Sequence, residues 1–217
     1  PQDFAADYAI SMAATFGAHV AGLAFLYEPV IPDGTLGGVP VDLIELQREE
    51  NSKTAKGAVD RFEAATKKAG VAAQSRILDA TFGGAATLFA RTARRFDLAV
   101  VGQAQREHGA SEELMIEGAL FESGRPVVVV PYIQKSGLTL ERVLICWDGG
   151  RTAARAVGDA MPFLERAKAV DIVIVAEERK NDEITGAKLS EHQSRRSIKA
   201  NVKRIAKGGL AVDAAIL

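Results

Sequence analysis

Two segments near the middle of the chain decide its fold: residues 97–102 read Asp-Leu-Ala-Val-Val-Gly, and residues 124–131 read Gly-Arg-Pro-Val-Val-Val-Val-Pro. Each contains a short, uninterrupted apolar run, which is typical of a strand buried on both faces of a parallel sheet. A polar loop and a helix expected over about 112–122 lie between them. This order predicts two neighbouring parallel strands joined by a crossover helix.

The same alternation is predicted from the N-terminus onward. The expected elements are a helix over 4–16, a strand over 19–27, a helix over 41–69, a strand over 71–78 and a helix over 83–96. The first helix has an apolar stripe with a spacing of four, and Gly17 and Gly70 are predicted to end the first and second helices. Alternation of this kind predicts an α/β fold with a parallel sheet and helices on both faces.

The order of elements restarts after a polar linker at 134–137. The second run is expected to hold a strand over 142–147, a helix over 152–166, a strand over 170–176, a helix over 184–207 and a strand over 210–217. Phe4–Ala9 resembles Thr152–Val157, and Lys68–Ala72 resembles Lys207–Ala211. We therefore predict a tandem repeat with a period of roughly 140 residues. The expected domains are 1–133, without its first strand, and 138–217, without its C-terminal part.

The composition is ordinary for a globular protein: of 217 residues, 47% are hydrophobic and 25% are charged, with a net charge of −1. Near-neutral charge gives no general attraction to nucleic acid or to anionic membranes. No apolar run reaches the roughly 18–20 residues that span a bilayer, and the N-terminus lacks a signal-peptide pattern. The single cysteine, Cys146, excludes an intrachain disulfide. We expect a cytoplasmic protein with no nucleic-acid or membrane partner.

On these segments the chain resembles the universal stress proteins of the tandem type. The resemblance rests on Val143–Gly150, on Ala153–Ala156 in the helix that follows, and on the two segments quoted first. It implies a flavodoxin-like fold of the adenine-nucleotide alpha-hydrolase-like type in each copy, with five parallel strands in the order 3-2-1-4-5. It also implies a protein that is usually dimeric.

The resemblance further implies a family divided between members that bind ATP and members that do not. Binding members carry a glycine, two residues, a second glycine, nine residues, and then glycine followed by Ser or Thr. Here Gly102 occupies the first position, Gln105 replaces the second glycine, and Gly118-Ala119 is the nearest match to the last pair, a few residues late. A phosphate loop needs glycines so that its N–H groups converge, and a hydroxyl as a further donor. We therefore predict that the first copy does not bind ATP.

The second copy keeps one residue of a nucleotide site. Asp148 matches the acidic residue that contacts adenine or ribose in binding members, and Asp148, Gly149, Gly150 and Gly102 form the candidate cofactor-binding set. The carboxyl end of a strand is where open α/β sheets bind ligands. Asp-Gly-Gly is equally ordinary turn chemistry, so both interpretations of Asp148 stay open.

No catalytic arrangement is discernible in the sequence. There is no Ser-His-Asp, Cys-His or paired-carboxylate pattern, and the three histidines have no metal-ligand spacing. A phosphoacceptor receiver domain would need an acidic cluster and a lysine near the fifth strand, where this chain has Arg125-Pro126. We therefore expect no enzyme activity, no catalytic residue, no metal and no resident cofactor.

The valine run has a further interpretation. In the family that the chain resembles, this fifth strand lies at the sheet edge and pairs antiparallel with its counterpart; here it is Val127, Val128, Val129 and Val130. A flat apolar edge that stayed bare would be an aggregation site, so we expect it to pair with a second chain or with the fifth strand of the second copy. The favoured function is a non-enzymatic role in the stress response through dimerisation or partner binding. The alternative is an ATP or adenine-nucleotide switch in the second domain.

Overall fold

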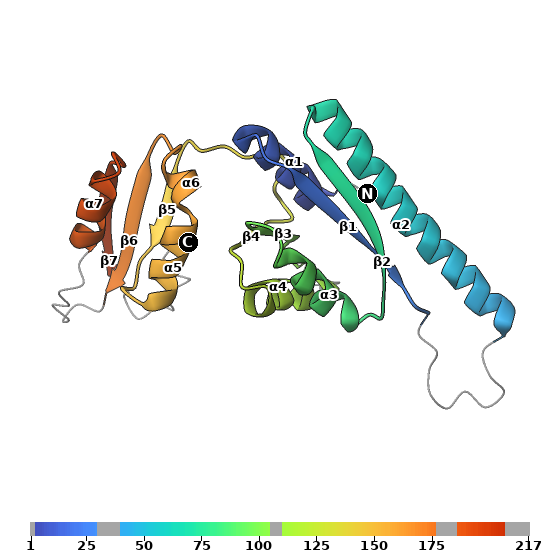
Figure 1. The fold of residues 1–217 in the computed structure, drawn as a ribbon. Helices are drawn as coiled ribbons and strands as arrows, with labels where there is room; N and C mark the ends of the chain where they lie inside the picture. The colour runs from blue at the N-terminus through green and yellow to red at the C-terminus, as the bar shows by residue number, and fades with distance from the viewer. Residues whose placement is uncertain (1–2, 30–39, 105–109, 177–185, 207–217) are drawn as a thin grey trace. The chain divides into compact units, whose positions relative to one another are not determined.

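The structure is a computed structural model that describes residues 3–29, 40–104, 110–176 and 186–206 (Figure 1). The chain divides into two compact units, Pro1–Leu138 and Thr139–Leu217, and each is described by itself. The division lies next to the predicted linker at 134–137; that each unit is a copy of one domain stays a prediction. Within the described ranges, no helix is both long and apolar enough to cross a membrane.

The first unit alternates helices and strands. Its elements are α1 (Phe4–Phe16), β1 (Val20–Tyr27), α2 (Val41–Ala69), β2 (Ala73–Ala80), α3 (Gly84–Ala93), β3 (Ala99–Gly102), α4 (Ala110–Glu122) and β4 (Val127–Val130). The Asp3 carboxylate accepts a hydrogen bond from the Ala6 N–H at 3.0 Å and caps α1. Gly17 and Gly70 end α1 and α2 with φ of 62° and 66°, in the left-handed region that glycine adopts without steric cost. Both predicted helix ends are confirmed.

The strands of the first unit form two parallel pairs. β1 pairs with β2 from Val20↔Ala73 onward, and β3 pairs with β4 from Ala99↔Val127 onward. The prediction of parallel pairing between the two valine-rich strands is confirmed. α2 lies along β1 and β2, α1 contacts both β1 and β3, and α3 packs against α4 (Figure 1). The five-stranded order 3-2-1-4-5 is not visible in these pairings, since β1 and β3 belong to separate two-stranded sheets.

Two glycines allow close packing in the first unit. A Cβ at Gly22 in β1 would lie 2.8 Å from the Phe62 ring of α2, which already fills that space. A Cβ at Gly118 in α4 would lie 3.0 Å from the carbonyl oxygen of Ala86 in α3. The contact between α3 and α4 is therefore made by small residues, and Ala119 beside Gly118 is completely buried.

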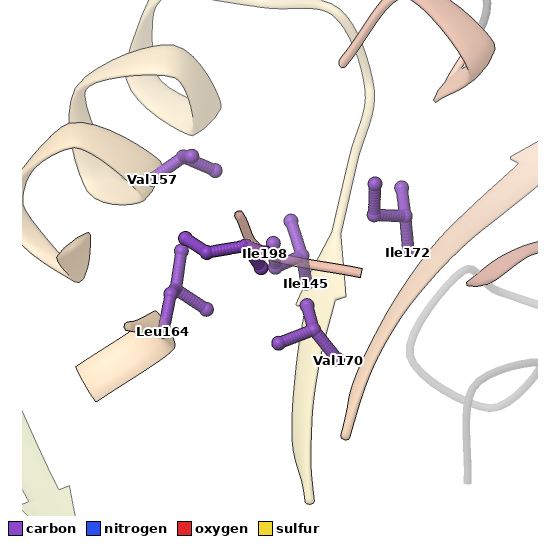
Figure 2. Packing of buried hydrophobic residues seen from close by; sticks show 6 residues of the cluster. All are labelled: Ile145, Val157, Leu164, Val170, Ile172 and Ile198. Carbon is purple, nitrogen blue, oxygen red and sulfur yellow. The ribbon is translucent and has the colours of Figure 1, made fainter. Parts of the chain in front are cut away.

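The second unit is a three-stranded parallel sheet with helices packed on it. Its elements are β5 (Val143–Cys146), α5 (Arg151–Asp159), α6 (Met161–Leu164), β6 (Val170–Ala176), α7 (Gly186–Ser194) and β7 (Ala200–Ala206), and the strand order is β5-β6-β7. One face of the sheet carries the core. Figure 2 shows its buried residues: Ile145, Val157, Leu164, Val170, Ile172 and Ile198.

Two helix predictions in the second unit are corrected. The helix expected over 152–166 is two helices, α5 and α6, because Pro162 has no N–H to continue the α5 ladder and instead occupies the first turn of α6. The helix expected over 184–207 ends at Ser194, and Ser197 follows with a left-handed φ of 62°. Residues 200–206 are then a strand, because they pair with β6 along its whole length. The strand predicted over 210–217 lies outside the described residues.

Candidate functional site

The candidate nucleotide residues of the second unit lie at the carboxyl end of β5. Asp148 follows that strand, Gly149 has a φ of 78°, and Gly150 is the extended N-cap residue of α5. The exposed Asp148 carboxylate accepts a hydrogen bond from the Gly150 N–H at 2.7 Å through Oδ1. This is an Asx-type turn, in which a carboxylate oxygen replaces a backbone acceptor. One Asp148 oxygen therefore serves the turn, and its role toward a ligand stays a prediction.

The surroundings of Asp148 provide few groups for a nucleotide. Trp147 precedes it, donates from its backbone N–H to the Val173 carbonyl at 2.8 Å, and packs half-buried against the core. The Trp147 Nε1 atom is buried, with no hydrogen-bond partner among the described residues. Arg151 is exposed at the first position of α5, where cations oppose the helix dipole. The second carboxylate oxygen and Arg151 could offer a ligand one acceptor and one cation.

Gly102, the remaining candidate, ends β3 in the first unit. A Cβ at Gly102 would meet Phe4 and Ala5 at ordinary distances of 3.5 and 3.7 Å, so packing does not require glycine there. Gln105 lies outside the described residues. Gly118 and Ala119 are buried within α4 rather than placed in a loop. The structure thus brings Asp148, Gly149 and Gly150 together, whereas Gly102 belongs to the other unit.

An aromatic group that the sequence analysis did not single out lies at the carboxyl ends of β1 and β2. The Tyr27 ring is 6.1 Å from the half-exposed Phe82 ring and 6.2 Å from the Phe25 ring, measured between centroids. Burial, with a smaller contribution from the Glu112 carboxylate, raises the pKa of the Tyr27 hydroxyl. Asn51 of α2 donates to the Tyr27 carbonyl at 2.8 Å. This contact fixes the end of β1 against α2.

A buried charge in β6 was also missed. Asp171 is 2% exposed and accepts hydrogen bonds from Arg142, from Lys203 Nζ at 3.1 Å and from Asn201 Nδ2 at 3.3 Å. The hydrogen bond from Arg142, followed by that from Lys203, holds the pKa of the Asp171 carboxyl below its usual value. The cluster lies near the amino ends of the strands, away from Asp148, so it fits a structural role. The sequence signal for this cluster was the acidic residue within the apolar run 170–176, because a buried carboxylate needs partners.

β4 is a strand edge with one described neighbour. Ala99 donates to the Pro126 carbonyl at 3.0 Å and Gln103 donates to the Val130 carbonyl at 2.8 Å. In a parallel ladder, alternate residues face each side of the strand. The backbone groups of Val127 and Val129 therefore point away from β3.

Large apolar side chains are exposed in β4 and in the chain segments that precede and follow it. We call the following set the edge patch: Leu120, Phe121, Val129, Tyr132 and Ile133. Val130, in contrast, is buried. Within the ranges that the structure describes, no three His, Cys, Asp or Glu side chains gather as a metal-ligand group.

Comparison with known proteins points to one fold. No family model and no curated protein matches the chain. Among solved structures, it is similar to a universal stress protein from Archaeoglobus fulgidus DSM 4304, with a TM-score of 0.67 and 16% identity over 94% of this chain and 73% of that one. The chain has a universal-stress-protein-like α/β fold. At this identity the likeness shows the fold alone.

In a universal-stress-protein-like fold, two places remain as candidates for function. One is the Asp148 turn at the carboxyl end of β5, and the other is the β4 edge with the edge patch. The exposure of Phe121 and Ile133 was not anticipated from the sequence. The helical pattern of α4 carried no signal for it, since Phe121 lies three residues after the buried Gly118, a spacing that puts two residues on the same face of a helix.

Proposed function

We propose that this chain is a non-enzymatic protein of the universal stress protein type, acting in the stress response through dimerisation or partner binding at β4. One observation carries the proposal: β4 is an uncharged, apolar strand whose outward backbone groups, at Val127 and Val129, meet no other described strand. Bare edges of this kind pair with another chain or must be protected. The proposal includes a cytoplasmic location and needs no cofactor.

We propose further that both units follow the strand order 3-2-1-4-5. The observed order β7-β6-β5 in the second unit corresponds to 3-2-1. In the first unit, this order would read β2, β1, one further strand, β3 and β4. The contacts of α1 with both β1 and β3, which do not pair with each other, support a strand position between them.

The association is tested on the full chain by light scattering after size exclusion. The expected result is a species of twice the 23.0 kDa chain mass, which Val129→Lys converts to monomer because a charge on an edge strand opposes pairing. Val41→Lys is the matched control, since Val41 is also exposed and apolar but lies in α2. A monomeric wild-type chain at about 50 µM, in the range where standard interfaces are occupied, would overturn dimerisation through β4.

The second candidate function is a nucleotide switch in the second unit. It is favoured by the exposed Asp148 carboxylate at the carboxyl end of β5, the strand end at which open α/β sheets bind ligands. The test is calorimetric titration of ATP into the full chain and into Asp148→Asn, which keeps an acceptor for the Gly150 N–H but loses the charge. Micromolar binding that the variant loses would favour the switch. An absence of binding heat at millimolar ATP would exclude the nucleotide switch.

A further inference from the structure

We infer that the dimer proposed above is anchored by Phe121 of one copy packing against Ile133 of its partner. The inference rests on the proposed function, because it assumes association through β4. These two side chains are the most exposed large hydrophobic side chains of the described residues, at 82% and 71%. Neither belongs to the β4 edge itself, so their contact is an addition to strand pairing.

The chain places the two side chains at opposite ends of β4. Phe121 is in the last turn of α4, which connects through a short segment to the amino end of β4. Ile133 lies past the carboxyl end, in a turn closed by the Gln134 N–H donating to the Pro131 carbonyl at 2.9 Å. Within one copy, the length of the strand therefore separates them.

A symmetric dimer brings the opposite ends together. In an isologous interface, the same surface of both copies meets across a two-fold axis. When this axis is perpendicular to the plane of the sheet, the two β4 strands run antiparallel, and the amino end of one lies beside the carboxyl end of the other. The outward backbone groups belong to Val127 and Val129, so the register that uses both residues is centred on Val128, with Val127 opposite the partner's Val129. This register puts each Phe121 next to an Ile133.

The exposed area fits a dimer and carries no charge. With about 200 Å² for an aromatic side chain and about 120 Å² for an aliphatic one, the edge patch exposes roughly 400–500 Å² per copy. Two copies would bury close to the ~1,000 Å² that a specific interface needs, before the paired backbone is counted. No residue of the edge patch or of β4 is charged. The patch can therefore meet itself without like-charge repulsion, which favours a second copy as the occupant.

The contact is tested by cysteine cross-linking in a Cys146→Ser background, since Cys146 is an exposed thiol. Phe121→Cys and Ile133→Cys are prepared as separate full-length variants, one with a cleavable tag, and oxidised alone and mixed. The expected result is a cross-linked dimer in the mixture and little from either variant alone. Predominant Phe121→Cys self-linking would overturn the geometry.

A second measurement separates this inference from the proposed function. Phe121→Ala should raise the dimer dissociation constant at least about 10-fold, because the dimer contains two Phe121–Ile133 contacts and loses a large apolar group from each, while Leu43→Ala on exposed α2 should not change it. One outcome would overturn the Phe121–Ile133 contact and leave association through β4 standing. In it, Val129→Lys disrupts the dimer, but the mixed cysteine variants do not cross-link and Phe121→Ala does not weaken the dimer. A monomeric wild-type chain would overturn both.

Discussion

Replacing Ile172 tests whether the second unit is held by the core between its sheet and its helices. Ile172 lies in the middle of β6, is 0% exposed, and belongs to the buried cluster of Figure 2. Ile172→Val removes one methylene group and should cost about 1 kcal/mol of unfolding free energy. Ile172→Ala removes three carbons and leaves a cavity, so it should cost about 3–4 kcal/mol.

The chain contains a suitable reporter for this measurement. Trp147 is the single tryptophan and packs against the same core, so its fluorescence during urea unfolding of the full chain follows the second unit. A unit of this size has on the order of 5–10 kcal/mol of stability. With an m-value of about 1–2 kcal/mol/M, the Ile172→Val midpoint should fall by roughly 0.5–1 M and the Ile172→Ala midpoint by roughly 1.5–4 M.

Val202 provides the matched control. It is paired with Ile172 across β6 and β7 and lies on the same face of the sheet, but it is 38% exposed. Val202→Ala should therefore cost less than about 1 kcal/mol, because less apolar area is lost and solvent can fill the space. Equal losses at the two positions, or a loss below 1 kcal/mol for Ile172→Ala, would refute the assignment of the core to this face.

Three further predictions concern charge, packing and the candidate site. The pKa of Asp171 is lowered in the folded state, so its contribution to stability is complete above the unfolded-state pKa near 4 and is lost as the pH falls below it. Asp171→Asn should therefore reduce the fall of the urea midpoint as the pH drops below about 4. In thermal melts followed by circular dichroism, Gly22→Ala should cost about 1–3 kcal/mol through its clash with Phe62, whereas Gly57→Ala inside α2 should gain about 0.5–1 kcal/mol. Asp148→Ala should lower the stability of the second unit by about 1 kcal/mol through loss of the turn hydrogen bond, and Asp148→Asn should retain most of it; equal losses would contradict the turn role.

The local signals in the sequence predicted the first unit well. α2 begins and ends at the predicted residues, because it starts directly after Pro40 and Gly70 stops it in the left-handed conformation. The pairing of β3 with β4 also followed from two short apolar runs joined by a helix. These features depend on residues that are close in sequence, which is why pattern and turn chemistry are sufficient to predict them.

Predictions failed where the structure depends on distant partners. Residues 200–206 carry basic side chains with a weak helical pattern, yet they form β7 because β6 offers a free edge and Asp171 accepts from Lys203. The donors to Asp171 come from β7 and from Arg142, the residue before β5, so no local window contains the cluster. For the candidate site, the sequence left the role of Asp148 open between turn and ligand, and the bond to the Gly150 N–H shows the turn contact.

The Asp171 cluster also has a consequence for how the second sheet assembles. A slip of β7 by one residue along β6 would turn Lys203 and Asn201 to the opposite face, because side chains alternate along a strand. The carboxylate would then stay buried with two of its three donors removed, and a buried charge without its partners is strongly destabilising. Apolar strands such as β6 could otherwise accept several alignments. One buried acid near the amino end of a hydrophobic strand thus destabilises misaligned sheets, and the second unit contains its own selection for the correct register.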